Sequence, residues 1–254
     1  MSVNIYHDLL EAKKKNHKKF AVLIDPDKLR LKKLGSVIEL AKKYKVDYFF
    51  IGGSLIVNDM LDKVLSSIRE ACDIPMILFP GNSYQLSYRA DGILFLSLIS
   101  GRNAELLIGN HVITAPFLKI SPLEVIPTGY MLIDGGVPTT VSYISNTQPI
   151  PSNKNDIAIS TALAGELLGL KTIFMDAGSG AQNPVPSAMI KAVREVIDVP
   201  IIIGGGIRTA DKIMENLEAG ADVIVIGDAI ESEPEKMEAY SRVFEEFNSK
   251  QNKG

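Results

Sequence analysis

Three glycine-rich segments in the C-terminal half of the sequence have the composition of an anion-binding site. Each one directly follows a short apolar run: Asp176–Ala181 reads DAGSGA, residues 204–206 read GGG, and Gly227 precedes Asp228. Glycine lets backbone N–H groups come close to an anion, and a helix that begins there adds roughly half a positive charge. We therefore expect a phosphate monoester to bind at these segments, with tight turns that need glycine as the simpler alternative.

The side chains of these segments allow more specific expectations. Ser179 has a hydroxyl and an N–H group that can both bond a phosphate. Asp228 is expected to use its backbone N–H, because its carboxylate would repel the phosphate, and its side chain is expected to cap the helix that follows. Asp176 ends an apolar run, where it can serve as a general base or simply as a helix N-cap.

A carboxylate and a hydroxyl follow the first two apolar runs of the chain. Asp25 lies in the sequence VLIDPDK, and Ser54 ends the sequence IGGS. Oxygen ligands suit Mg²⁺, which usually takes one or two protein groups and completes its shell with substrate phosphates and water. Asp25 and Ser54 are therefore a candidate magnesium site if the two runs are neighbouring strands. The alternative is that Asp25 and Ser54 are ordinary turn residues and bind no metal.

The elements that would position these residues alternate along the chain. Eight apolar runs rich in β-branched and aromatic residues are uniform enough to be strands covered on both faces: Phe20–Ile24, Tyr48–Ile51, Met76–Phe79, Gly92–Leu96, Gly129–Ile133, Thr172–Met175, Ile201–Ile203 and Val223–Ile226. Between most of them lie segments with apolar positions every three or four residues: Leu29–Tyr44, Met60–Cys72, Ala104–Ile108, Ile157–Leu168, Ser187–Val196 and Ala210–Ala219. This order predicts an α/β fold, the (β/α)8 TIM barrel, whose active sites lie at the carboxyl ends of its strands. A doubly wound open sheet is the alternative.

Two connections depart from this regular order. Only Pro80–Asp91 separates the third strand from the fourth, which is too short and too poor in helix formers for a crossover helix. The third helix is therefore expected to be irregular or missing. The segment Gly135–Asn155 is long, polar and without periodicity, which is typical of a functional lid. We expect residues 1–254 to form a single domain with a final helix over Glu233–Gly254.

The composition excludes several classes of protein. A net charge of −3 gives no general attraction to nucleic acid. The single cysteine, Cys72, excludes an intramolecular disulfide and a cysteine metal cluster, and it favours a cytoplasmic location. Residues 1–20 are rich in Lys and His and lack the apolar segment of a signal peptide. No apolar run approaches the roughly 18–20 residues of a membrane span.

The motifs DPDK, GGS, LFPGN, DAGSGA, GGGIR and GDAI occur in this order between about Phe20 and Ile230. In the order and spacing of these motifs the sequence resembles the geranylgeranylglyceryl phosphate synthase family, and within it the second group, of archaeal and Bacteroidetes type. The resemblance implies a Mg²⁺-dependent prenyl transfer. In that reaction sn-glycerol 1-phosphate attacks C1 of a polyprenyl diphosphate of the geranylgeranyl type, an ether bond forms, and pyrophosphate is released.

The resemblance also assigns residues to this reaction. It implies that Asp25 and Ser54 hold the metal. It implies a glycerol phosphate site made of Phe174, Met175, Asp176, Ala177, Gly178, Ser179, Gly180, Gly205, Gly206, Gly227 and Asp228. Phe174 and Asp176 stand where the family often has Tyr and Glu, and Leu23 stands where the first group has Lys. The carboxylate of Asp176, one methylene shorter than that of Glu, is expected to act as the general base.

The resemblance also implies partners, and the residues leave alternative functions open. The resemblance implies a homo-oligomer, a dimer or a hexamer, and Tyr130, Met131 and Tyr143 are expected to be exposed apolar residues of its interface. Membrane contact is expected to be transient, because the donor and the product are both amphiphiles. The alternatives are another phosphate-binding barrel enzyme, such as an isomerase or a synthase of a phosphorylated metabolite, and a barrel that binds a phosphorylated ligand without catalysis. An apolar groove across the top of the barrel would favour prenyl transfer, and a wholly polar pocket would favour the alternatives.

Overall fold

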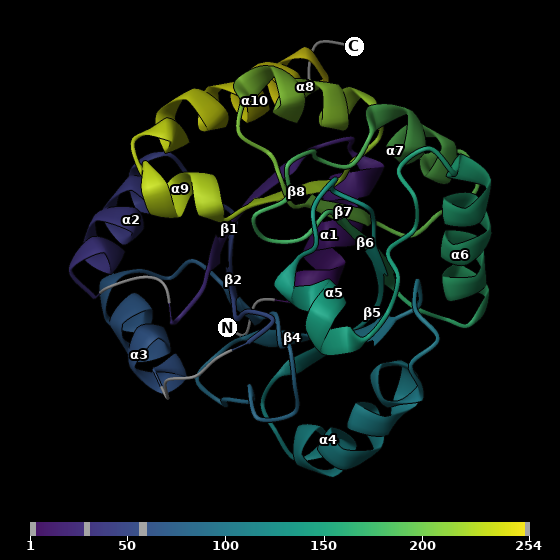
Figure 1. Cartoon of the computed structure of the whole chain (residues 1–254). Helices are drawn as coiled ribbons and strands as arrows, with labels where there is room; N and C mark the ends of the chain where they lie inside the picture. The colour runs from purple at the N-terminus through teal and green to yellow at the C-terminus, as the bar shows by residue number, and fades with distance from the viewer. Residues whose placement is uncertain (1–3, 28–30, 56–59, 252–254) are drawn as a thin grey trace.

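Eight strands in the described part of the chain close into a parallel barrel, as the sequence predicts (Figure 1). This computed structural model describes residues 4–27, 31–55 and 60–251. Neighbouring strands pair in chain order, and β1 closes the barrel against β8. The strands are β1 (Lys19–Ile24), β2 (Tyr48–Ile51), β3 (Met76–Leu78), β4 (Gly92–Leu98), β5 (Glu124–Leu132), β6 (Thr172–Asp176), β7 (Ile201–Gly204) and β8 (Val223–Ile226).

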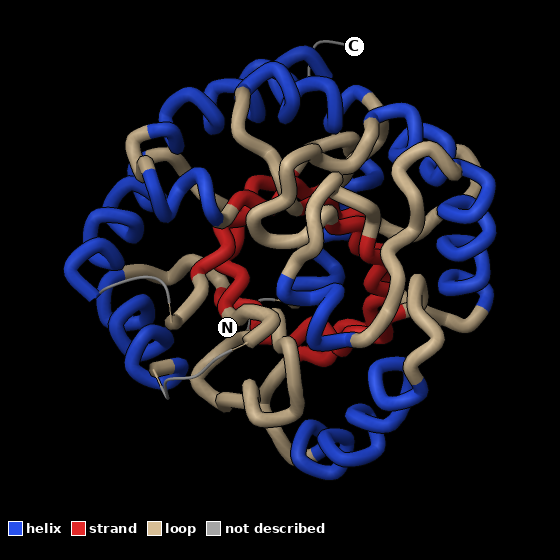
Figure 2. Tube along the Cα trace, in the orientation of Figure 1, coloured by secondary structure: helices blue, strands red, loops and turns tan. Residues whose placement is uncertain are grey.

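A ring of helices surrounds the strands (Figure 2). Its members are α2 (Leu31–Lys43), α3 (Leu61–Ala71), η1 (Glu105–Gly109) with α4 (Asn110–Lys119), α6 (Asn155–Leu167), α7 (Ser187–Arg194), α8 (Ala210–Glu218), α9 (Asp228–Ser232) and α10 (Lys236–Gln251). The connection after β3 is the exception, as predicted: residues 79–91, all of them described, form turns and loop without a helix. Figure 2 shows this loop between α3 and α4.

Two predicted boundaries are wrong around the fourth and fifth strands. β5 begins at Glu124, well before the predicted start at Gly129, and the helical segment before it runs on past Ile108 to Lys119. Each of the two elements contains a proline, a residue that usually ends a helix or a strand because it lacks an N–H donor. Here Pro116 lies inside α4, and Pro127 lies inside β5, where its carbonyl still accepts a hydrogen bond from the N–H of Lys171.

The predicted lid is not wholly irregular. It contains a short helix, α5 (Thr140–Ser145), whose start is fixed by a capping box in which Thr139 and Ser142 bond each other's backbone N–H groups. The helix ends at Asn146, which adopts the left-handed conformation that asparagine tolerates. Two other predicted helix ends, residues 29–30 and 252–254, lie outside the described residues.

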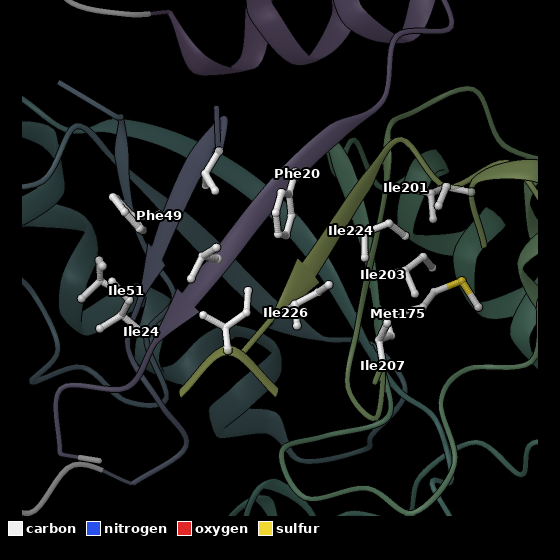
Figure 3. Close-up of a cluster of buried hydrophobic side chains, with 14 of the residues drawn as sticks. Phe20, Ile24, Phe49, Ile51, Met175, Ile201, Ile203, Ile207, Ile224 and Ile226 are labelled. Atoms are coloured by element: carbon white, nitrogen blue, oxygen red, sulfur yellow. The ribbon is translucent and has the colours of Figure 1, made fainter. Parts of the chain in front are cut away.

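Side chains alternate between the two sides of the barrel wall along each strand. Those that point outward pack under the helices in one large core, which includes Phe20, Ile24 and Ile203 (Figure 3). Those that point inward, such as Ala21, Phe50 and Phe174, form a second core inside the barrel. The alternation therefore decides which residues at the carboxyl end of a strand can face a ligand.

The helix α1 (Ile5–Lys14) closes the amino end of the barrel. Its residues Ile5 and Leu9 are buried in the inner core. The carboxylate of Glu124, the first residue of β5, accepts hydrogen bonds from the N–H groups of Ile5 and Tyr6 at 2.5 and 2.8 Å. In Figure 1 the helix lies within the ring that the other helices form. The carboxyl end of the barrel is left as the entrance.

Candidate active site

The carboxyl ends of the strands present two carboxylates to the inside of the barrel. On β1 the inward positions are Ala21 and Leu23, and Asp25 follows them in the same alternation. On β6 the inward position Phe174 is followed by Asp176, the last residue of the strand. Both carboxylates are largely buried, with exposed fractions of 8% for Asp25 and 7% for Asp176. Sequence reasoning placed both residues at this end.

A cavity with polar and apolar groups in its wall opens between these strand ends, and we call it the polar cavity because the carboxylates of Asp25, Asp176 and Asp228 line it. The predicted residues in its wall are Asp25, Ser54, Phe174, Asp176, Gly178, Ser179, Gly205, Gly206, Gly227 and Asp228. Three predicted residues lie beside it instead. Met175 points outward into the helix-facing core, the N–H of Ala177 donates to the carbonyl of Gly204 at 3.2 Å, and Gly180 donates to the carboxylate of Asp228.

Gly205 sets how closely the ends of β6 and β7 approach each other. Its φ of +79° is one that side chains of L-residues rarely adopt. A Cβ atom at this position would lie 2.5 Å from Oδ1 of Asp176 and 2.6 Å from the backbone nitrogen of Gly178. Both distances are shorter than any van der Waals contact, so glycine is required for this turn to lie against Asp176.

The carboxylate of Asp228 does not cap the helix that follows it, so that part of the prediction is wrong. Asp228 is the first residue of α9, which has no side-chain cap. Its carboxylate instead accepts hydrogen bonds from the hydroxyl of Ser179, at 2.9 and 3.1 Å, and from the N–H of Gly180 at 2.7 Å. The side chain crosses the cavity edge and ties the DAGSGA turn after β6 to the end of β8.

Asp176 has the environment of a general base. Its Oδ2 accepts a hydrogen bond from the hydroxyl of Tyr130 at 2.7 Å, and its Oδ1 accepts one from the N–H of Gly178 at 2.8 Å. Burial raises the pKa of Asp176 above that of an ordinary carboxyl group, and the charge of Asp228 adds to this effect. The hydrogen bonds from Tyr130 and Gly178 act in the opposite direction and lower the pKa. Asp176 is therefore a fixed carboxylate with increased basicity.

Asp25 and Ser54 come together at the ends of the neighbouring strands β1 and β2. Gly53 permits the approach, because a Cβ atom there would lie 3.1 Å from Oδ2 of Asp25. The turn that holds Asp25 is fixed at both sides. Its N–H donates to the carboxylate of Glu231 at 3.2 Å, and its Oδ1 accepts from the N–H of Asp27 at 3.0 Å. Both candidate ligands offer oxygen atoms, the donors that Mg²⁺ prefers.

An apolar cavity adjoins the polar one at the side where the ring of helices is interrupted. Its walls come from the loop after β3, from β4, from η1 and α4, and from α5, and they include Phe79, Leu86, Phe95, Leu96, Leu106 and Ile144. Ser54, Phe79 and Tyr130 line both cavities. An apolar cavity thus lies directly beside the cavity that holds the glycine turns.

A comparison with protein families identifies the group to which this barrel belongs. The model of the PcrB family matches residues 12–246, which include every strand and both cavities. The chain belongs to the PcrB family.

Relatives of this PcrB chain have similar sequences over nearly their whole length. The geranylgeranylglyceryl phosphate synthase of Chitinophaga pinensis is 55% identical over 92% of this chain and 92% of its own. The protein of the same name from Spirosoma linguale is 51% identical over 94% of this chain and 96% of its own. The crystal structure of (S)-3-O-geranylgeranylglyceryl phosphate synthase from Thermoplasma acidophilum in complex with its substrate sn-glycerol-1-phosphate superposes with a TM-score of 0.90. That structure is 31% identical in sequence, and the match covers 97% of this chain and 99% of that one.

Two residues of the PcrB site were not predicted from the sequence. Arg208 lines the polar cavity, and its guanidinium donates to the carbonyls of Ala181 at 2.6 Å and Gln182 at 3.3 Å. Arg208 could have been predicted as a site residue, because it closely follows the glycine turn in the motif GGGIR. Tyr130 was predicted to be exposed at an interface together with Met131, and that prediction is wrong. Both are buried, because they lie on opposite sides of the barrel wall in β5: Tyr130 faces the inside of the barrel and Met131 faces the helices.

Proposed function

We propose that this PcrB protein is a prenyltransferase that joins a polyprenyl group of the geranylgeranyl type to sn-glycerol 1-phosphate through an ether bond. The observation that carries the proposal is the meeting of a glycine-lined polar cavity with an apolar cavity at Ser54, Phe79 and Tyr130. Such a pair accommodates one small phosphorylated substrate and one long apolar substrate with their reacting ends together. The names of the relatives support the same reaction.

The apolar cavity also argues against the alternative functions. An isomerase or synthase of a small phosphorylated metabolite has no use for a wall of Leu86, Phe95, Leu96 and Leu106 beside its phosphate site. A barrel that only binds a phosphorylated ligand has no need of a buried carboxylate with raised pKa. Prenyl transfer uses both features.

The proposed reaction depends chiefly on positioning. The phosphate is held by the turns at Gly205–Gly206 and Gly227–Asp228 and by the backbone N–H of Ser179, whose hydroxyl donates to Asp228. A free hydroxyl of the glycerol then points towards C1 of the donor. The C1–O bond of the donor breaks, and its electron pair leaves with pyrophosphate. The hydroxyl oxygen bonds to C1, and its proton passes to Asp176. Each carboxylate oxygen has a second lone pair, so Asp176 can accept this proton while Tyr130 and Gly178 remain bonded.

Magnesium is part of the proposal, and Asp25 and Ser54 are the residues that would hold it. Their donor set consists of oxygen atoms at the ends of adjacent strands, brought together because Gly53 has no side chain. Such a site supplies two protein ligands and leaves the remaining positions to the diphosphate and water, as is usual for Mg²⁺. The ion would neutralise the diphosphate and favour its departure.

We expect the substitution Asp25→Asn to weaken Mg²⁺ binding at least about tenfold, because loss of even an outer-shell partner of a metal site typically costs about 10–100-fold. Manganese titration followed by electron paramagnetic resonance, in the presence of pyrophosphate, measures this affinity without turnover. Asp134→Asn is the matched control, since the Asp134 carboxylate accepts the N–H of Gly136 outside both cavities. Equal metal affinity in both variants would refute the metal assignment.

The substitution Tyr130→Phe is expected to move the acid limb of the pH–rate profile to higher pH. The hydrogen bond from Tyr130 lowers the pKa of Asp176, so its loss raises that pKa further above the ordinary value. A base is active only when deprotonated, and therefore the variant loses activity at a pH where the wild type is still active. The ring remains, which preserves the packing against Phe79 and Phe174. An unshifted acid limb would mean that Asp176 is not the titrating base.

The direct test of the function is an assay of the purified protein with radiolabelled sn-glycerol 1-phosphate, Mg²⁺ and prenyl diphosphates of increasing length. Label in the organic phase is expected, and the preferred donor reports the length of chain that the apolar cavity accepts. Tight binding of glycerol phosphate without product from any donor would contradict the proposal and favour another barrel chemistry.

The location and the partners complete the proposal. A cytoplasmic location is supported by the single cysteine, Cys72. Transient membrane contact is proposed because both the donor and the product are amphiphiles, and none of the helices in the described ranges has the length and apolar character needed to cross a bilayer. A homo-oligomer is supported by exposed apolar side chains, which lie at Tyr143 as predicted and along the outer face of α4 at Val112, Ile113 and Phe117.

A further inference from the structure

Three aromatic rings gather where the apolar and polar cavities meet. The ring of Phe79 lies 5.1 Å from that of Phe174 and 5.9 Å from that of Tyr130, measured between centroids. Tyr130 and Phe174 lie 5.6 Å apart in an edge-to-face arrangement. They come from three different places in the barrel: Phe79 follows β3, while Tyr130 and Phe174 are register partners on β5 and β6. We call these three residues the aromatic cluster.

The cluster lies at the place where the proposed reaction occurs. Phe79 and Tyr130 line both cavities, and Phe174 lines the polar one. Tyr130 also donates a hydrogen bond to Asp176, the proposed base. A donor whose diphosphate lies near Asp25 and Ser54, with its tail in the apolar cavity, has C1 beside these rings.

Allylic chemistry gives this position a specific electrostatic need. When the C1–O bond of a prenyl diphosphate breaks before the new bond is complete, positive charge spreads over the allylic carbons. Two of the rings are shielded from water, since Tyr130 and Phe174 have exposed fractions of 6% and 1%, while Phe79 is half-buried at the cavity wall. The π face of an aromatic ring attracts a cation within about 6 Å of its centroid, and the attraction increases when water is excluded.

We propose that the aromatic cluster, through Phe79 in particular, stabilises the allylic cation that develops at C1 during prenyl transfer. This inference rests on the proposed function. It assigns Phe79 a catalytic role that packing alone does not require. In this role the ring acts on the transition state and not on the ground state, so it contributes to kcat and leaves the affinity for both substrates unchanged.

The test replaces Phe79 with phenylalanines that carry one, two and three ring fluorines, which withdraw electron density from the π face while the size of the ring changes little. Single-turnover rates are measured with both substrates saturating, so that product release does not hide the chemical step. The rate is expected to fall with each added fluorine, by about two- to thirtyfold across the series. The KM values for donor and acceptor are expected to stay constant.

Phe244 provides the matched control. Its ring is buried in the core under the helices, stacked on that of Phe20 at 4.9 Å, and it lines neither cavity. The same fluorinated series at Phe244 is expected to leave the single-turnover rate unchanged. An unchanged rate along the Phe79 series, or the same decrease at Phe79 and Phe244, would overturn the inference.

The result also separates this inference from the proposed function. If the wild type forms the ether product and the single-turnover rate does not change along the Phe79 series, only the proposed cation stabilisation is wrong. If the wild type forms no ether product with any donor, both proposals are wrong.

A second variant, Phe79→Leu, keeps an apolar side chain but has no π system. Its single-turnover rate is expected to be as low as that of the variant with three ring fluorines. A Phe79→Leu variant with the wild-type rate would also overturn the inference.

Discussion

Replacing Gly205 with alanine is expected to raise the KM for glycerol phosphate at least about tenfold and to lower kcat about a hundredfold. The new Cβ atom would lie 2.5 Å from the Asp176 carboxylate and 2.6 Å from the nitrogen of Gly178, so the ends of β6 and β7 must separate. A displacement of about 1 Å at a reacting group can cost about a hundredfold in rate. One methyl group thereby disturbs the phosphate site and the base together.

The same substitution should not unfold the protein. A left-handed conformation costs an alanine about 1–2 kcal/mol, and overpacking adds about 1–3 kcal/mol. A typical domain has about 5–15 kcal/mol of stability, so the variant remains folded and can be assayed. Gly169→Ala is the matched control, because Gly169 has a φ of +87° and a methyl group added there would meet no other group within 4 Å. The Gly169→Ala variant should lose stability and keep the wild-type kcat and KM for glycerol phosphate. Wild-type kinetics in Gly205→Ala would exclude this turn from the substrate site.

Asp176→Asn is expected to lower kcat by about 10²–10⁴-fold, the usual contribution of a general base. The KM for glycerol phosphate should change little, because the glycine turns and Ser179 hold the phosphate. Asparagine has nearly the same shape, and its carbonyl oxygen can still accept the N–H of Gly178. The acid limb of the pH–rate profile that reports this carboxyl group should disappear.

Thermal unfolding separates loss of a base from loss of structure. Burial raises the pKa of Asp176, so at neutral pH the folded state carries an ionised group that it disfavours relative to the unfolded state. The stability attributable to this group is present at low pH and is lost as the pH rises through its folded pKa. A neutral asparagine removes that cost, and the Tm at pH 7 should not fall. Asp47→Asn, at a half-buried carboxylate whose pKa is also raised by burial, is the control at the other end of the barrel, and it should retain kcat. An unchanged kcat in Asp176→Asn would exclude the base assignment.

The barrel could be predicted from the sequence because parallel strands covered on both faces are uniformly apolar. Runs such as Ile201–Ile203 and Val223–Ile226 therefore stand out without knowledge of their neighbours. The same reasoning placed Asp25 and Asp176 at the entrance, since each directly follows such a run. That residues 1–254 form one domain stays a prediction.

The parts that could not be predicted depend on register and on contacts between distant segments. Tyr130 lies in a predicted strand, but that it faces the inside of the barrel and reaches Asp176 depends on the register of β5 against β6. The carboxylate of Asp228 bonds Ser179, 49 residues earlier in the chain, where a local pattern suggested a helix cap. The apolar cavity is built from the loop after β3 together with α4 and α5, and no single segment contains its pattern.

The closure of the amino end by α1 has a consequence for how the protein is made. The carboxylate that accepts the first N–H groups of α1 belongs to Glu124, 119 residues further along the chain than Ile5. At roughly 5–20 residues per second, the ribosome needs about 6–24 s to synthesise that stretch. Throughout this interval the apolar side chains of Ile5 and Leu9 have no barrel to enter. The helix α1 is thus synthesised well before the barrel that it closes, and a nascent chain exposes it to chaperones until that barrel has formed.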